Sequence, residues 1–227
     1  MLTRRTECDG VCTTDGAGPV LFYKSDFRAK MSLMRRIFLA IHASSALQAE
    51  AIAWQANYER LPVRWLKGHN LHLTLIPPWY ESDIEKVKSK IEKAGNTVRP
   101  FAIRFERVTY GPNPRSPRLI WAEGRTPREM EDLKSKIENL LRQQPAASQE
   151  RGEPRLGGPR RENRPFRLHL TLARFHPEDF SQFPLKHLDS PVDWRNEVKS
   201  FVLMESHLAP GGAEYEILET YSLKPGT

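Results

Sequence analysis

One pentapeptide, Leu-His-Leu-Thr-Leu, occurs twice in the chain, at Leu71–Leu75 and at Leu168–Leu172. Each copy alternates apolar and polar residues, which is the period of a β-strand. On a strand, His72 and Thr74 project from one face while the leucines project from the other into a core. On a helix, residues two positions apart diverge and cannot serve one site. The duplication therefore predicts two strands, each presenting a His–Thr pair on its polar face.

The second copy presents His169 and Thr171, so the two strands together suggest a cleft with an imidazole on either side. Imidazole has a reference pKa of about 6.5, so one neutral ring can accept a proton from water while the other donates one to a leaving oxygen. The threonine hydroxyls can donate to phosphate oxygens. Arg174 can add charge there, although its odd offset from Thr171 requires a bend or a strand end. The pattern favours in-line displacement at phosphorus and requires no metal.

Start and stop signals predict three helices. The capping-box spacing of Ser82–Glu85 starts one that ends near Gly95. Thr126–Glu129 repeats this device, and the apolar stripe of the helix that follows is Met130, Leu133, Ile137, Leu140 and Leu141. An earlier helix is expected from about Ser45 to Tyr58.

Alternating or short apolar stretches predict strands at residues 34–41, 101–105, 118–122, 198–205 and 215–223. Helices and strands mix without a steady βαβ alternation. The predicted fold class is therefore α+β with a largely antiparallel sheet, rather than a doubly wound α/β fold.

Residues 1–33 show no apolar period and several turn-forming residues, so we expect an N-terminal extension, disordered or a mis-assigned start, before a domain at 34–227. The extension lacks the apolar stretch of a signal peptide. The only cysteines, Cys8 and Cys12, cannot build a disulfide framework, which indicates a reducing, cytoplasmic compartment. No run reaches the roughly 18 apolar residues of a membrane span.

The paired His-x-Thr-x motifs resemble those of the 2H phosphoesterase superfamily. The flanking sequence is similar to its bacterial and archaeal branch, the RNA 2′,3′-cyclic phosphodiesterases, also called 2′-5′ RNA ligases. Besides the motifs, the matching stretches are Met34–Ile41, Arg64–Leu66, Pro117–Ala122, Arg164–Arg174 and Leu203–Leu208. The resemblance extends from about residue 34 to residue 223.

This resemblance implies a two-lobed, pseudo-twofold α+β fold with antiparallel sheets around a central cleft and helices outside. It implies hydrolysis of a terminal 2′,3′-cyclic phosphate on RNA to a 2′-phosphomonoester, weak 2′-5′ ligation and no cofactor. Carried onto matching positions, His72 resembles the general acid and His169 the general base. The residues that resemble the phosphate ligands are Thr74, Thr171 and Arg174.

The chain departs from the family pattern at Pro77, where many relatives carry an aromatic residue that stacks on a base. Trp79 or Tyr80 is expected to take over that stacking. A metal site at His69 and His72 is not expected, because an offset of three on a strand points the two rings to opposite faces.

The expected partner is RNA with a 2′,3′-cyclic phosphate terminus, or a cyclic nucleotide, and the protein is expected to be a monomer without membrane contact. Two alternatives remain open. One is another 2H activity, on 2′-5′ oligoadenylate or a small cyclic nucleotide. The other is an RNA-binding module that performs no acid–base step.

The net charge of +7 is concentrated in one segment, because seven arginines and three glutamates lie between Arg142 and Arg167. Residues 145–165 are rich in Pro, Gly, Gln and Arg, which predicts a long mobile loop. The loop is either a solvated segment without a role or an electrostatic arm for the RNA backbone.

Overall fold

The computed structural model describes residues 34–113, 115–142, 159, 165–209 and 212–224. The chain divides into two units, Met1–Met34 and Arg35–Thr227, and all the elements below belong to the second. The extension predicted at 1–33, with its two cysteines, lies outside the described residues, and so does nearly all of the loop predicted at 145–165. Among the described residues, no helix is long and apolar enough to span a membrane.

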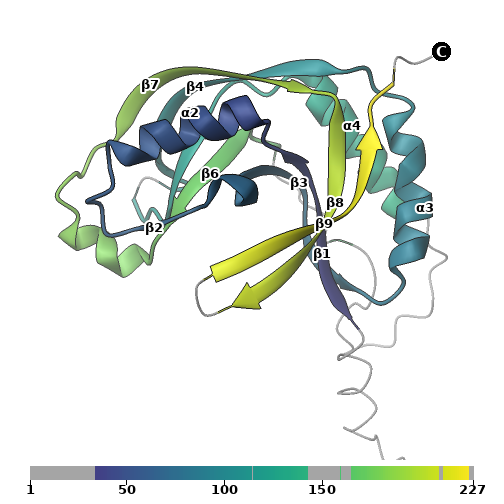
Figure 1. Cartoon of the computed structure of the whole chain (residues 1–227), viewed down its shortest axis with the longest axis horizontal. Coiled ribbons are helices and arrows are strands. Elements are labelled where there is room, and N and C mark those ends of the chain that lie inside the picture. The colour runs from purple at the N-terminus through teal and green to yellow at the C-terminus, as the bar shows by residue number, and fades with distance from the viewer. Residues whose placement is uncertain (1–33, 114, 143–158, 160–164, 210–211, 225–227) are drawn as a thin grey trace, which may run out of the picture. The chain divides into compact units, whose positions relative to one another are not determined.

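The described strands form two sheets, and all their pairings are antiparallel (Figure 1). The four-stranded sheet has the order β3-β1-β8-β9, with strands His72–Glu81, Arg35–His42, Ser200–Ala209 and Gly212–Ser222. The five-stranded sheet has the order β2-β6-β5-β4-β7, with strands Arg64–Trp65, His169–Arg174, Leu119–Glu123, Phe101–Gly111 and Asp189–Val198. The two copies of the pentapeptide therefore lie in different sheets, on β3 and on β6.

Three α-helices and two short 3₁₀ helices are described: α2 (Ser45–Ala56), α3 (Ile84–Gly95), α4 (Arg128–Arg142), η1 (Gly68–Asn70) and η2 (Pro177–Gln182). Helices α3 and α4 pack on each other, α3 also contacts β8 and β9, and α2 lies against β7 and η1 (Figure 1). The predicted α+β class with antiparallel sheets is confirmed.

The ends of α3 differ from the prediction by one residue. Asp83, not Ser82, is the N-cap, and its carboxylate accepts a hydrogen bond from the backbone N–H of Lys86 at 3.0 Å. Gly95 is the last residue of the helix rather than a left-handed cap, and Asn96 follows as the C-cap. The glycine serves packing, since a Cβ there would lie 2.6 Å from the backbone oxygen of Ser222 on β9.

Thr126 has a different role from the helix cap that its spacing predicts. Its hydroxyl accepts a hydrogen bond from the backbone N–H of Leu168 at 2.9 Å and lies 3.3 Å from the backbone oxygen of Phe166. The hydroxyl thus fastens the segment before α4 to the segment before β6. The apolar stripe of α4 is buried as predicted, apart from the half-buried Leu140.

The four-stranded sheet has two distinct apolar faces. Ile37, Leu39 and Leu73 belong to the main core. Phe38 and Ala40 belong to a second, small cluster on the opposite face of β1, because successive strand residues alternate. The same cluster includes Val202 and Met204 of β8, with Tyr215 packed against it. This second face carries the candidate site.

Candidate active site

Strand β3 presents the first motif as the alternation predicts. Leu73 and Leu75 are fully buried in the main core, while His72 and Thr74 line a cavity on the other face. His72 is 9% exposed, so its ring is largely removed from solvent.

Strand β6 presents the second motif in the same way. Leu170 and Leu172 are fully buried in the core, which places His169 and Thr171 on the opposite face. Thr171 is opposite Trp121 of β5, and His169 is opposite Glu123.

A β-bulge resolves the odd offset of Arg174. The register of β5 with β6 shifts by one residue between Ile120 and Trp121, so β6 carries one extra residue. Leu172 and Ala173 are consequently both buried in the core, and the alternation resumes with Arg174 on the side of His169. The exposed Arg174 lines the same cavity as His72.

Both motif histidines are oriented by a backbone carbonyl of the segment just before their strand. His72 Nδ1 lies 2.7 Å from the carbonyl oxygen of Asn70, and His169 Nδ1 lies 2.9 Å from the carbonyl oxygen of Arg167. Because a carbonyl can only accept, Nδ1 donates in both rings. In the neutral form of each ring, Nε2 is then the basic nitrogen. The two copies share this arrangement, with the acceptor two residues before the histidine.

Aromatic side chains pack around each ring. His72 packs against Phe38 and Tyr215, with centroid distances of 5.0 and 4.8 Å, and these two rings also contact each other at 5.1 Å. His169 packs on Trp121 at 4.9 Å, and the Arg167 guanidinium lies 5.1 Å from the centroid of that indole. These contacts limit the rotation of both imidazoles.

Burial lowers the pKa of His72 to about 4. The hydrogen bond to Asn70 raises this pKa, whereas the positive charges of Arg174, His42 and His169 lower it further. The His72 ring is therefore neutral near pH 7 in the free protein. The same coupling indicates that His169 and Arg174 lie within electrostatic range of His72 although they come from the other sheet.

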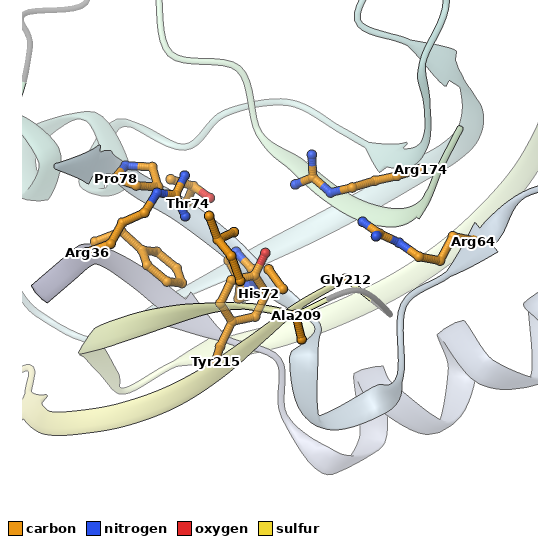
Figure 2. Close-up of a pocket in the computed structure, with 12 residues that line it drawn as sticks. Arg36, Arg64, His72, Thr74, Pro78, Arg174, Ala209, Gly212 and Tyr215 are labelled. Carbon is orange, nitrogen blue, oxygen red and sulfur yellow. The ribbon is translucent and has the colours of Figure 1, made fainter. Parts of the chain in front are cut away.

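The cavity has a volume of about 450 Å³ and lies between the two sheets (Figure 2). Three arginines are among the described residues that line it, and none of these described residues is acidic. Figure 2 shows Arg36 beside Thr74 and Pro78, while Arg64 and Arg174 lie on the other side of His72. Such a pocket, with two ionisable rings nearby, suits an anionic substrate and proton transfer.

The two residues whose carbonyls accept from the motif histidines are Asn70 and Arg167. The side chain of each donates a hydrogen bond to a glutamate. Asn70 Nδ2 donates to Glu214 of β9 at 3.0 Å. Arg167 Nη2 donates to the buried Glu123 at 2.6 Å, and Arg107 donates to the other oxygen of Glu123 at 2.8 Å.

Glu214 also accepts from residues of the loop before β3. Lys67 Nζ lies 3.2 Å from its carboxylate and His69 Nε2 lies 3.3 Å from it. The hydrogen bonds from Asn70, His69 and Lys67 lower the pKa of Glu214 to about 2. This carboxylate therefore connects the β8–β9 hairpin to the turn that precedes His72.

The structure corrects the expected role of Trp79. Its side chain is 6% exposed and belongs to the main core, so its indole offers no surface for a base. Pro78 lines the cavity instead. Tyr80 is 46% exposed but is not among the residues that line the cavity.

Sequence reasoning missed most of the residues that line the cavity, among them Arg36, Phe38, Arg64 and Tyr215. Alternation along β1 was a usable signal for two of them, since Arg36 and Phe38 alternate with Ile37 and Leu39 and so project from the opposite face of the strand. The other two depend on which strands pair.

One group of potential metal ligands lies outside this cavity. Glu205, His207 and Glu216 have ligand atoms within 4.8 Å of one another on β8 and β9. Glu205 already forms an ion pair with Arg35, and it projects from the face of β8 opposite to Met204. This group is therefore separate from the His72 side of the sheet.

A family model described as the 2′-5′ RNA ligase superfamily matches residues 43–209. An RNA 2′,3′-cyclic phosphodiesterase of Escherichia coli is 31% identical over 196 residues, which are 85% of this chain and 99% of the relative. A protein of the same name from Thermus thermophilus is 28% identical over 83% of this chain and 90% of the relative.

Solved structures give the same picture. A crystal structure of a phosphoesterase has a TM-score of 0.62 and 25% identity, and the match covers 85% of this chain and 99% of that one. E. coli LigT complexed with 3′-AMP has a TM-score of 0.59 and 25% identity, with the same coverage. The expected phosphoesterase fold is thus confirmed.

Proposed function

Because this chain belongs to the 2′-5′ RNA ligase superfamily, we propose that it hydrolyses the terminal 2′,3′-cyclic phosphate of RNA to a 2′-phosphomonoester. Three curated relatives named RNA 2′,3′-cyclic phosphodiesterase, at 26%, 28% and 31% identity, support this activity. The described residues that line the cavity include three arginines and no acidic residue, which suits an anionic substrate such as a cyclic phosphate.

In the proposed reaction, His169 accepts a proton through Nε2 from the water that attacks phosphorus. The bond between phosphorus and the 3′ oxygen breaks, and His72 donates a proton to that oxygen. The product carries a 2′-phosphomonoester and a free 3′-hydroxyl, so atoms and protons balance. The hydroxyls of Thr74 and Thr171 and the guanidinium of Arg174 bind the phosphate oxygens as charge develops there. Every step is assigned to a side chain, so the proposed mechanism requires no metal.

The general acid has to carry a proton, whereas burial lowers the pKa of His72 to about 4 in the free protein. A bound phosphate opposes this effect, because an opposite charge within about 4–6 Å raises the pKa of an imidazole by about 1–3 units. Binding of the anionic substrate therefore supplies the condition under which His72 can act as the acid.

The observation that carries this proposal is the shared arrangement of the two motifs. Both rings donate through Nδ1 to a carbonyl two residues back, at 2.7 and 2.9 Å, and the charge of His169 acts on the pKa of His72. Two basic Nε2 atoms set up in this way support acid–base catalysis at one phosphorus.

The test is incubation of an oligonucleotide that ends in a 2′,3′-cyclic phosphate, in the presence of EDTA, with phosphorus NMR of the product. We expect a 2′-phosphomonoester. His72→Ala and His169→Ala should each lower kcat by about 10²- to 10⁴-fold, the contribution of one proton transfer. The exposed His176→Ala serves as the control variant. A requirement for added metal, or a 3′-phosphomonoester as product, would contradict the mechanism.

The same assay decides between the remaining alternatives. Faster cleavage of 2′-5′ oligoadenylate or of a small cyclic nucleotide would keep the chemistry and change the substrate. RNA binding that survives the double histidine variant, without turnover by the wild type, would indicate a binding module. Weak ligation follows if the 5′-hydroxyl of a second RNA replaces water, since expulsion of the 3′ oxygen then leaves a 2′-5′ linkage.

A further inference from the structure

Arg64 and Arg174 are directly opposite each other in the antiparallel pair of β2 and β6. Side chains at opposed positions of such a pair project from the same face, and like charges placed there destabilise a sheet. Among the described residues, no carboxylate is paired with either guanidinium. Two cations are thus held side by side without a counter-ion from the described part of the protein.

Gly212, the first residue of β9, lies against the guanidinium of Arg64. Gly212 has a φ of +119°, which favours glycine, and a Cβ at this position would lie 2.6 Å from Arg64 Nη1 and 2.8 Å from Cζ. The guanidinium therefore packs directly on the backbone of the hairpin. A side chain at residue 212 would push Arg64 out of its position.

Both guanidiniums belong to the cavity of the candidate site. Arg64 and Arg174 line it together with His72, and Figure 2 shows the two groups side by side with their nitrogens directed toward the His72 side. The charge of Arg174 contributes to the lowered pKa of His72. A phosphoryl group that reacts beside His72 therefore lies close to two fixed positive charges.

We propose that Arg64 is a second phosphate-binding residue, which with Arg174 forms a two-guanidinium clamp that selects a doubly charged phosphoryl group over a singly charged one. The inference rests on the proposed function for its substrate. A cyclic phosphate diester carries one negative charge, whereas the five-coordinate transition state and the 2′-phosphomonoester product approach two. The clamp stabilises the transition state more than the bound substrate, and it also retains the product.

A binding measurement tests the clamp without turnover. Calorimetry at about pH 8, where a phosphomonoester is a dianion, compares methyl phosphate with dimethyl phosphate, a monoanion of similar shape. We expect the wild type to prefer methyl phosphate, and Arg64→Met to reduce this preference by about tenfold or more, since a hydrogen bond between charged groups is worth about 1.5–3 kcal/mol.

Two further variants sharpen the comparison. Arg64→Lys keeps the charge but loses the planar pair of donors, so it should recover part of the preference. Arg195→Met removes an exposed arginine of β7 that pairs with Asp193, and it should leave the preference unchanged. Equal preference in the wild type and in Arg64→Met, with both proteins folded by circular dichroism, would overturn the clamp.

Kinetics separate the clamp from the proposed function. Arg64→Met should lower kcat more than it raises KM, and it should weaken inhibition by a nucleoside 2′-phosphomonoester. If the wild type binds methyl phosphate through Arg64 but does not hydrolyse cyclic phosphates, the clamp stands and the function is wrong. If hydrolysis proceeds and Arg64→Met changes neither kcat nor product inhibition, the function stands and the clamp is wrong.

Discussion

His72 is buried in the wall of the cavity, and its surroundings have two opposite effects on the charge of its ring. Loss of solvent favours the neutral ring, while the hydrogen bond from Nδ1 to Asn70 favours the charged one. Burial has the larger effect, so the pKa falls. A nearby anion raises the pKa of His72 again and so favours the charged ring.

The pKa of the His72 ring can be measured directly by titration. NMR of imidazole-labelled protein should place the His72 midpoint near pH 4 in the free protein. Inorganic phosphate should raise it, and Arg174→Met should also raise it, because the charge of Arg174 lowers this pKa. The matched control is Arg195→Met, far along the other sheet. If phosphate leaves the titration midpoint of His72 unchanged, there is no anion-binding site beside this ring.

Single residues also show where sequence patterns succeed. The His-x-Thr alternation was predictable because the leucines between these residues have only one face of the strand to bury. Trp79 was predicted wrongly because Pro77 and Pro78 predict the end of the strand, whereas strand alternation continues past them and directs Trp79 into the core. Two register shifts between β1 and β3 each add one residue to β3, so together they preserve strand parity and the indole lies on the face of Leu73.

At the scale of elements, short contacts between segments far apart in the sequence support each motif. Thr126 fastens the segment before α4 to Leu168, and Glu214 fastens β9 to the turn before β3. Neither contact is readable from local patterns, because each joins partners more than 40 residues apart. The Thr126 hydroxyl looked like a helix cap for the same reason.

We predict that Glu214→Gln lowers kcat by about two- to fivefold, since each exposed ion pair contributes only a little to holding its partners in place. The variant keeps the shape of the side chain and removes the charge that holds Lys67 and His69. Salt screens such pairs, so the gap to the wild type should narrow at high ionic strength. Glu197→Gln, an exposed glutamate of β7 paired with Lys199, is the control. A gap that salt does not change would point to a purely steric role for Glu214.

Strand β7 was not predicted at all. Most of its residues are polar or charged, and only Trp194, Asn196 and Val198 are buried. The strand is held by its pairing with β4 rather than by its own composition. Long-range pairing also brings Arg64 beside Arg174, so local sequence patterns could not predict that Arg64 belongs to the clamp.

At the scale of the whole molecule, the buried His72 links proton binding to stability. Its pKa is lower in the folded protein than the reference value of 6.5, so the unfolded chain binds a proton more readily between about pH 6.5 and pH 4. Stability should therefore fall as the pH falls through this window. The loss attributable to His72 is about 3 kcal/mol below pH 4, and it vanishes above pH 6.5.

Urea unfolding as a function of pH checks this linkage. His72→Gln should flatten the curve between about pH 4 and pH 6.5, because glutamine does not titrate. His176→Gln, which removes an exposed histidine, should keep the wild-type curve. An identical slope in wild type and His72→Gln would show that the ring is not desolvated in solution.

The main-chain acceptors of the two rings have one more consequence. Each imidazole donates to a main-chain carbonyl two residues before it, in the segment that leads into its strand, so its direction follows the main chain of that segment. Substitutions around the cavity can alter charge and affinity while both rings keep their direction. Heating removes that direction when the segment before β3 or the segment before β6 loses its structure, so catalytic turnover reports on both segments at once.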